Sequence, residues 1–369
     1  MARKGYFISI GAGLNQTPLI FAARNLGYSI ISVDKNSNSE GFALSDLMIQ
    51  ESILDYRKIY TQLIQIFLDK PIQGIGCRSF GKANYTAAYI SDKLNLIFPK
   101  QKVISPFLDK RALNQFLSSK GILTPRQINL HSPNEKKEFS KSSMTRYIRK
   151  PFDGESKKGI QVFNTIKEIE NNLDFETKEY LVEEFIDGDE VTVLGFVQNK
   201  KFNLILLTDK ITTSYSPFLE RAHIYPSKFE VYSGEIHLIC QLICNYTGLE
   251  NSPFCAEFKI TKDGRIYLIE AVPEIGGEYL AEALLPELKY NYFENYVRLM
   301  TNKEIELPKL NKQKSMIYFS APPEGKSELI DLTELSPEQS EKIFFNRKDR
   351  KSTRLNSSHL DLSRMPSSA

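Results

Sequence analysis

Cysteine and histidine are both scarce in this sequence, which holds four of each among 369 residues. The cysteines have neither the spacing of a zinc site nor that of a disulfide framework, and Cys240 and Cys244 lie one helical turn apart. We therefore expect buried free thiols and a reduced, cytoplasmic location. Zinc enzymes and secreted disulfide-rich scaffolds are excluded.

A clear excess of one charge is also missing. Lys and Arg total 48 against 45 for Asp and Glu, which leaves a formal charge of +3. Nucleic-acid and membrane-surface partners require clustered basic residues, so we expect neither. No apolar run reaches the roughly 18 residues of a membrane span. The apolar stretch after the basic start MARKG is too short for a signal peptide.

Residues 1–100 alternate between short apolar runs and helical periods. The expected strands are 6–10, 28–33 and 74–78, and the expected helices are 17–25, 56–68 and 83–94. Strands separated by helices indicate an α/β domain with a parallel sheet that is covered on both faces. Residues 99–106, which contain two prolines, are interpreted as a linker.

The rest of the chain has an α+β pattern. Asp109 can cap a helix over 110–119, which Gly121 ends. Beyond it we expect strands at 147–150, 160–163, 180–183, 191–197 and 202–208, a helix at 234–247 and a hairpin over 256–271. Residues 352–369 hold six serines without a sustained period, so we expect disorder there. This tail also resembles translated vector sequence, and we expect a native C-terminal region cut short near Arg350.

A glycine turn follows the first expected strand. Gly11 and Gly13 precede a helix, and Asp34 ends the next strand, as in a dinucleotide-binding fingerprint. The third glycine of that fingerprint is missing, because Gln16 takes its place. Two interpretations remain open, an NAD site and a tight strand-to-helix turn.

The hairpin over 256–271 carries the most specific pattern. Asp263-Gly264 is a favoured two-residue turn, and counting outward from it places Phe258 opposite Ile269 on an apolar face. The same register places Glu257 opposite Glu270, two like charges about 5 Å apart. A divalent cation between the carboxylates would explain them, since Mg²⁺ binds carboxylate and phosphate oxygens. The alternative is a solvated face with a shifted register.

Two lysines sit where a cation needs an anion. Lys150 shares a strand face with Ile148, so its stem should be half buried and its ammonium paired. The loop that follows, 152–159, has lysines between glycines and can fold over phosphates, or it is a charged surface hairpin. Lys110 lies in the first turn of its helix, where the macrodipole disfavours a cation unless an anion or water compensates.

The stretch over 180–190 is a strand followed by acids. Such an edge strand can bind an adenine through its backbone, and a later carboxylate can hold ribose hydroxyls. Surface acids around a hairpin would have the same pattern. Taken with the glycine-turn domain, the ordered motifs DKRALNQFL, RKPFDGESKKG, LVEEFIDGDE and EFKITKDGRIYLIEA over about residues 5–300 resemble the ATP-grasp superfamily. Within it, the chain is similar to the carboxylate–amine ligases of purine biosynthesis and dipeptide formation.

This resemblance implies a Rossmann-like domain over 1–105 and an ATP-grasp domain over 106–300, whose lid spans about 120–184. A C-terminal segment over 301–350 and a tail over 351–369 would follow. The implied cofactors are ATP and Mg²⁺, or Mn²⁺ in its place. The implied partners are small-molecule carboxylate and amine substrates, and dimers are common in the family, so a homodimer is compatible with it.

The resemblance also implies the role of each site residue. The phosphates would be contacted by Lys110, Lys150 and the loop residues Gly154, Ser156, Lys157 and Gly159. The adenine hinge would comprise Glu183, Phe185 and Ile186, with Glu190 holding the ribose. The metal would bind Glu257 and Glu270, and the catalytic acceptor site would contain Lys210 and Arg221.

One segment departs from the family pattern. Where family members have E-x-N-x-R or E-x-A-x-R, this chain has Glu270, then Val272 and Glu274. Val272 cannot ligate a second metal, and Glu274 reverses the charge of an arginine that holds a substrate carboxylate. Glu274 is either part of an acidic rim for a cationic substrate or paired internally with a lysine or Arg221.

The leading hypothesis is therefore an ADP-forming ligase that makes an amide through an acyl phosphate. The alternatives are a non-catalytic ATP-binding protein, which Val272 and Glu274 would favour, and an NAD-dependent oxidoreductase that uses the glycine turn.

Overall fold

The computed structural model describes residues 3–66, 68–128, 146–151, 160–171, 180–214, 218–309, 313–319, 345–346 and 358–359. The chain divides into two compact units, Met1–Ala321 and Pro322–Ala369. In the described part of the second unit, β15 (Phe345–Asn346) pairs antiparallel with β16 (Ser358–His359). Every other element belongs to the first unit. No described helix is both long and apolar enough to cross a membrane.

The chain begins with a parallel sheet of four strands in the order β3-β2-β1-β4. Its strands are β1 (Tyr6–Ile10), β2 (Ser29–Asp34), β3 (Leu47–Gln50) and β4 (Ile72–Cys77). The helices between them are η1 (Leu14–Gln16), α1 (Thr17–Asn25), η2 (Glu40–Leu44) and α2 (Tyr56–Gln65), and α3 (Lys82–Leu94) follows β4. The strands β1, β2 and β4 are buried almost continuously, as in a parallel sheet covered on both faces, whereas only Ile49 of the edge strand β3 is buried. The predicted α/β domain is confirmed.

The segment 99–106, which the sequence predicts as a linker, is largely helical. It contains the helix α4 (Gln101–Ile104) and starts the 3-10 helix η3 (Ser105–Leu108), and its side chains Val103 and Ile104 are buried. Pro106 lies in the first turn of η3, where a missing N–H costs little, so this proline starts a helix. The next helix, α5 (Lys110–Ser119), has the predicted bounds, and Asp109 accepts from the Ala112 N–H at 2.9 Å.

A small antiparallel sheet of four strands comes next, in the order β5-β8-β6-β7. Its strands are β5 (Gln127–Ile128), β6 (Tyr147–Pro151), β7 (Gln161–Phe163) and β8 (Tyr180–Glu184). The helix α7 (Ile166–Asn171) covers it, and a separate small core forms from Ile128, Tyr147, Phe163, Ile169 and Val182.

The largest sheet has six antiparallel strands in the order β13-β12-β9-β10-β11-β14. Its strands are β9 (Asp189–Gln198), β10 (Lys201–Thr212), β11 (Glu220–Tyr225), β12 (Ser252–Ile260), β13 (Ile266–Val272) and β14 (Ser315–Tyr318). Its helices are η4 (Glu230–Tyr232), α8 (Ser233–Thr247), the π-helical turn η5 (Leu280–Leu284), α9 (Leu285–Glu287) and α10 (Tyr292–Met300).

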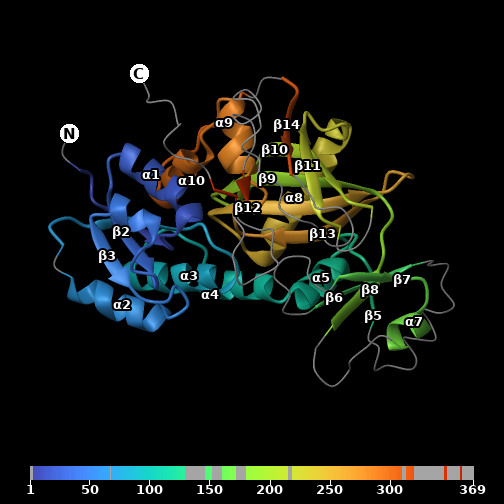
Figure 1. The fold of residues 1–369 in the computed structure, drawn as a ribbon, viewed down its shortest axis with the longest axis horizontal. Coiled ribbons are helices and arrows are strands. Elements are labelled where there is room, and N and C mark those ends of the chain that lie inside the picture. The colour runs from blue at the N-terminus through green and yellow to red at the C-terminus, as the bar shows by residue number, and fades with distance from the viewer. Residues whose placement is uncertain are drawn as a thin grey trace. The chain divides into compact units, whose positions relative to one another are not determined.

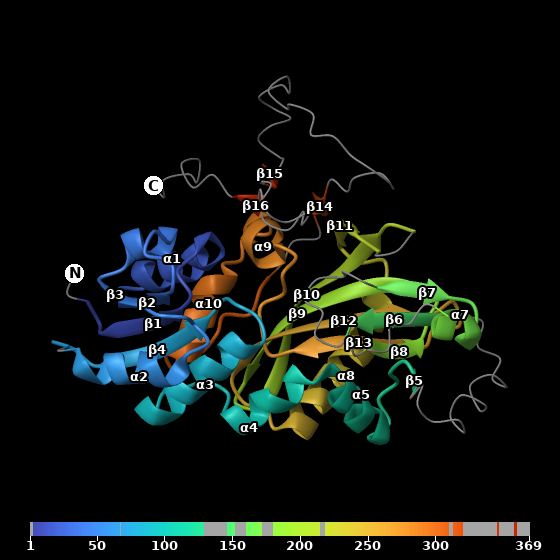
Figure 2. The same ribbon diagram turned by 60° about the horizontal axis from the view of Figure 1, so that its bottom comes forward.

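The two faces of the six-stranded sheet differ. On one face Val191, Val193, Phe258 and Leu268 join a core with α5 and α8, and Figure 2 shows both helices along this side. The side chains that alternate with these four along their strands point to the other face. Part of that face packs on the first sheet through α10, which lies beside α1 in both ribbon views (Figure 1) and beside β4 in Figure 2. The rest of it is polar and forms the candidate site.

The predicted register of the β12–β13 hairpin is partly wrong. The turn has three residues between Thr261 and Arg265, whose backbones bond (Thr261 N to Arg265 O, 3.0 Å), and Gly264 adopts a φ of +83° that suits glycine. Phe258 therefore pairs with Leu268 rather than with Ile269. A register shift between Glu257 and Phe258 then restores the predicted pairing of Glu257 with Glu270.

All four cysteines are buried and free, as predicted. Burial raises the pKa of the Cys77 and Cys244 thiols to about 12, so both stay protonated at neutral pH.

Candidate functional site

The polar part of the six-stranded sheet comes from alternate residues on neighbouring strands. Glu190 on β9 lies opposite Lys210 on β10, and Lys259 on β12 lies on the other side of Glu190. Two residues before Lys259 on the same strand is Glu257, which faces Glu270 on β13. Because side chains in a strand alternate between faces, these groups share one face of the sheet.

Each carboxylate of the Glu257–Glu270 pair also contacts a lysine. Lys110, from the first turn of α5, lies 2.7 Å from Glu270, and Lys210 lies 2.5 Å from Glu257. Burial lowers the pKa of Lys110, but the Glu270 and Glu257 carboxylates outweigh it and raise that pKa above its usual value. The anion that Lys110 required is thus Glu270.

Lys210 is the centre of a larger carboxylate group. Its side chain is 1% exposed, and its ammonium contacts Glu257 at 2.5 Å, Glu278 at 2.8 Å and Glu220 at 2.9 Å. Desolvation lowers the pKa of Lys210, yet Glu257, Glu278 and Glu220 raise it well above its ordinary value. The surrounding carboxylates thus favour the charged form of Lys210.

The Glu257–Glu270 pair fits a divalent cation. The two side chains are 22% and 33% exposed, so both reach the surface of the sheet. Carboxylate oxygens are the ligands that Mg²⁺ and Mn²⁺ accept, usually together with phosphate oxygens and water. The lysines on either side hold the carboxylates in place.

Lys150 and Glu183, both predicted to contact a nucleotide, contact each other. They lie on the paired strands β6 and β8, with the Lys150 ammonium 2.7 Å from a Glu183 oxygen. Glu183 is buried, and the Lys150 side chain is 26% exposed. The sequence thus predicted a half-buried lysine with an anionic partner, and the structure identifies that partner as Glu183.

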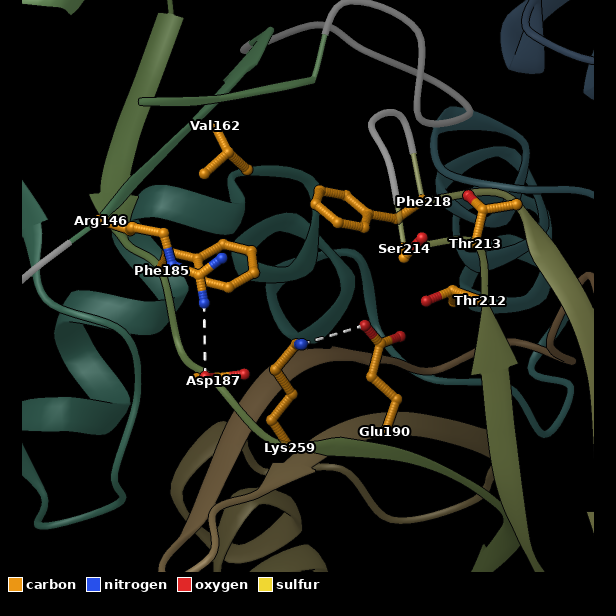
Figure 3. Close-up of a pocket in the computed structure, with 10 residues that line it drawn as sticks. All are labelled: Arg146, Val162, Phe185, Asp187, Glu190, Thr212, Thr213, Ser214, Phe218 and Lys259. Carbon is orange, nitrogen blue, oxygen red and sulfur yellow. Dashed lines mark ion pairs between the residues drawn. The ribbon is translucent and has the colours of Figure 1, made fainter. Parts of the chain in front are cut away.

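A pocket of about 500 Å³ lies between the two antiparallel sheets (Figure 3). It contains the predicted residues Phe185 and Glu190, and the other lining residues are Arg146, Val162, Asp187, Thr212, Thr213, Ser214, Phe218 and Lys259. Ile186 does not line it, because its side chain is buried. Ile186 can thus contribute only its backbone.

The charged residues of the pocket form two ion pairs. Lys259 lies 3.3 Å from Glu190 and 5.3 Å from the ring centre of Phe185, and Arg146 lies 3.4 Å from Asp187 and 4.3 Å from the same ring. Figure 3 shows both pairs close to the ring of Phe185. Planar aromatic and cationic groups around a cavity can bind a nucleobase, and a carboxylate can accept from ribose hydroxyls.

Sequence analysis missed Arg146, Phe218 and Lys259. Lys259 follows Glu257 by two residues on a predicted strand, so alternation alone could have placed it on the same face. Arg146 and Phe218 precede strands in other segments, and no local pattern connects them to the pocket. The predicted loop residues Gly154, Ser156, Lys157 and Gly159 lie outside the residues that the structure describes.

Arg221 and Lys210 were predicted to share an acceptor site, but Arg221 turns to a different partner. Its guanidinium donates to the Tyr318 hydroxyl at 2.5 Å and lies 5.4 Å from that ring. Asp209, next to Lys210, accepts from the Ser227 hydroxyl at 2.5 Å, which fixes the chain after β11. The contact of Arg221 is thus with β14, at the edge of the sheet.

Neither interpretation of Glu274 holds. Its side chain is buried, so it is not part of an exposed acidic rim, and it accepts from the Gly81 N–H at 2.7 Å, at the start of α3. Burial raises the pKa of Glu274 to about 7, against the effect of the Gly81 hydrogen bond. Nearby, Arg78 pairs with Glu282 at 2.7 Å, with both side chains 4% exposed.

The glycine turn is stabilised by its own neighbours. Gly11 has a φ of +101°, which favours glycine, and the Ala12 N–H donates to Asp34 at 3.0 Å. Gln16 donates to the Arg78 carbonyl at 2.9 Å and to the Ser79 hydroxyl at 3.1 Å. These bonds favour the tight-turn interpretation over a dinucleotide site.

Comparison with known proteins agrees with this fold. Residues 150–282 match the family model of the ATP-grasp domain. The fold is similar to that of N5-carboxyaminoimidazole synthetase from Staphylococcus aureus complexed with ADP, at a TM-score of 0.71 and 18% identity over 86% of this chain and 83% of that one. No curated protein matches the sequence.

Two further solved structures have the same fold. Phosphoribosylglycinamide synthetase from Anaerococcus prevotii has a TM-score of 0.69 and 19% identity, over 85% of this chain and 79% of that one. The L-amino acid ligase from Bacillus licheniformis has a TM-score of 0.64 and 18% identity, over 82% of this chain and 75% of that one.

Proposed function

We propose that this chain, which contains an ATP-grasp domain and belongs to that superfamily, is an ADP-forming carboxylate–amine ligase that requires Mg²⁺, or Mn²⁺ in its place. In this reaction an oxygen of the first substrate's carboxylate attacks the γ-phosphorus of ATP, and ADP leaves. The amine nitrogen of the second substrate then attacks the acyl carbon, the amide forms and phosphate leaves. The printed names of the similar structures include synthetases and a ligase, which supports this class.

The observation that carries the proposal is the facing pair Glu257 and Glu270 with a lysine on each side. A divalent cation bound there would neutralise charge on the transferring phosphoryl group. Lys110, beside Glu270 and 57% exposed, is placed to contact phosphate oxygens. Catalysis by this chain would consist of positioning and charge neutralisation, without a covalent nucleophile.

The pocket between the sheets would hold the nucleoside. Phe185 offers a ring to the base, and Glu190, held by Lys259, offers a carboxylate to the ribose. Lys150, whose ammonium Glu183 holds, would contact phosphates together with the loop over 153–159. In this assignment the nucleoside and the metal carboxylates lie on one face of the same sheet. The reason is that Glu257 and Lys259 are two residues apart on β12, so their side chains share a face.

The proposal extends to organisation and setting. The Rossmann-like domain would span 1–105 and the ATP-grasp domain 106–300, with a lid over about 120–184. We propose small-molecule carboxylate and amine substrates, a cytoplasmic location and, as in many such ligases, a homodimer.

The test is ADP release in a screen of pooled carboxylates and amines, with ATP and Mg²⁺. Hydroxylamine is added to trap an acyl phosphate as a hydroxamate, which is identified by mass spectrometry. ADP release that depends on one carboxylate, with formation of its hydroxamate, supports the ligase. ADP release without any hydroxamate or amide would overturn the proposed reaction.

A non-catalytic ATP-binding protein is the second candidate, and Val272 favours it. This residue pairs with Cys255 and brings no oxygen to the site, and Glu274 is buried against α3 instead of facing a substrate. Such a protein would bind ATP with Mg²⁺ in equilibrium dialysis, but no substrate pool would stimulate ADP release.

A further inference from the structure

The surroundings of Lys210 have the composition of a cation site. Oxygens of Glu220 and Glu278 and a ring nitrogen of His223 all lie within 4.8 Å of one another, and Glu257 borders the same space. His223 and Glu278 are buried, and Glu220 is 24% exposed. Carboxylate and imidazole groups at such distances are common ligands of divalent metals.

A cation is already present among these groups. The Lys210 ammonium contacts three carboxylates at 2.5–2.9 Å and is almost completely buried. Buried carboxylates are costly unless a positive charge compensates them, and one ammonium here serves three acids. The site therefore holds three acidic side chains for one ammonium, and burial raises the pKa of Glu278 well above its ordinary value.

The next residue after Glu270 on the same face of β13 brings no oxygen. This residue is Val272, which pairs with Cys255. The Lys210 ammonium instead lies on the other side of Glu257 from Glu270. The Lys210 ammonium thus takes the position beside Glu257 in which a second cation would otherwise bind that carboxylate.

We propose that the Lys210 ammonium fills a built-in cation site formed by Glu220, His223, Glu257 and Glu278, so that this chain binds one divalent cation with ATP instead of two. The count of one rests on the proposed function. The cation site itself does not, because it depends only on the contacts of Lys210. Removing the ammonium while keeping the side-chain volume should then open a site for a divalent metal.

The experiment is a titration with Mn²⁺, in which electron paramagnetic resonance measures free Mn²⁺ in the presence and absence of an unreactive ATP analogue. Wild-type protein should bind one Mn²⁺ per chain with the analogue. The variant Lys210→Met should bind one more than wild type, and it should do so without the analogue as well. Its thermal midpoint should be lower than that of wild type without metal and should rise more with Mn²⁺.

The matched control is Lys228→Met, which removes the ammonium of an exposed lysine paired with Asp189 at 3.1 Å. This variant should bind as many Mn²⁺ ions as wild type. A Lys210→Met variant that gains no Mn²⁺ would overturn the inference, and so would two ions per wild-type chain with the analogue. The wild-type count decides the matter if Lys210→Met does not fold.

The result is separable from the proposed function. A wild-type chain that binds no Mn²⁺ with the analogue would contradict the ligase proposal, whereas the gain of an ion by Lys210→Met without nucleotide would still support the cation site.

Discussion

Two regions of this chain carry clusters of polar side chains, one at the carboxyl ends of the first sheet and one on a face of the six-stranded sheet. The contacts of these side chains differ between the two regions. At the carboxyl ends of β1, β2 and β4, Asp34 bonds the Ala12 N–H, Gln16 bonds the chain after β4, and Arg78 pairs with Glu282. On the polar face of the six-stranded sheet, the lysines Lys110 and Lys210 contact four carboxylates, those of Glu220, Glu257, Glu270 and Glu278.

The difference separates structural groups from candidate functional ones. In the first region each polar group named above has a partner that matches it, so the fold accounts for the group. On the polar face of the six-stranded sheet the acids outnumber the lysines that contact them, and an added cation would improve the balance. Four predictions test this comparison.

The largest effect is expected for Glu270→Gln. It removes one of two facing charges, so the fold should persist, but Mg²⁺-dependent ATP turnover should fall by at least about 100-fold, the usual cost of losing an electrostatic group at a transition state. The control is Glu287→Gln, which neutralises an exposed acid. Turnover at the wild-type rate in Glu270→Gln would contradict the metal assignment.

The next effect concerns the buried pair of the first region. Arg78→Met leaves the Glu282 carboxylate buried without its cation, and the free energy of unfolding should fall by about 3–5 kcal/mol in urea denaturation. Glu282→Gln added to Arg78→Met should recover part of the loss. In contrast, Arg265→Met breaks a pair whose side chains are 57% and 58% exposed, and it should change the free energy of unfolding little. Equal losses in both single variants would break the comparison.

Glu274 should make stability depend on pH. Burial raises the pKa of Glu274 to about 7 in the folded chain, from an ordinary value of 4.5. Between these two pH values the folded chain keeps the proton of Glu274, whereas the unfolded chain loses it. The stabilisation that is present below pH 4.5 is lost as the pH rises through 7, by about 3 kcal/mol. Denaturation at pH 5 and pH 8 should show this loss in wild type and much less of it in Glu274→Gln. An identical pH profile for both proteins would contradict the raised pKa.

The smallest effect is expected for Asp34→Ala. It removes the acceptor of the Ala12 N–H and should lower the free energy of unfolding by about 1 kcal/mol, with the KM for ATP unchanged. NADH fluorescence should respond equally to both proteins. If Asp34→Ala abolished NADH binding that wild type shows, the glycine turn would be a dinucleotide site after all.

Sequence patterns predicted local features well where the cause is local. Asp109 caps α5 as expected, because a side-chain oxygen at that position reaches the N–H groups of the first turn. The Glu257–Glu270 pairing was also predicted, although through a turn that is one residue longer and a register shift that compensates for it.

Sequence patterns did not predict which side chains or backbone groups the charged residues would contact. The sequence required an anion beside Lys150 but did not identify Glu183, which lies on a strand more than thirty residues away. It gave Glu274 an exposed or lysine-paired role, whereas packing of the first sheet against the segment after β13 buries Glu274 on the Gly81 N–H.

The sequence by itself determined the alternation of strands and helices, the caps, and the facing of Glu257 and Glu270, since backbone geometry and side-chain periodicity act over a few residues. Only the tertiary structure decided that Lys210 binds Glu220, Glu257 and Glu278, which come from three separate segments. Burial of an ammonium favours the carboxylates nearest in space, and that proximity depends on how β10, β11, β12 and the segment before η5 pack together.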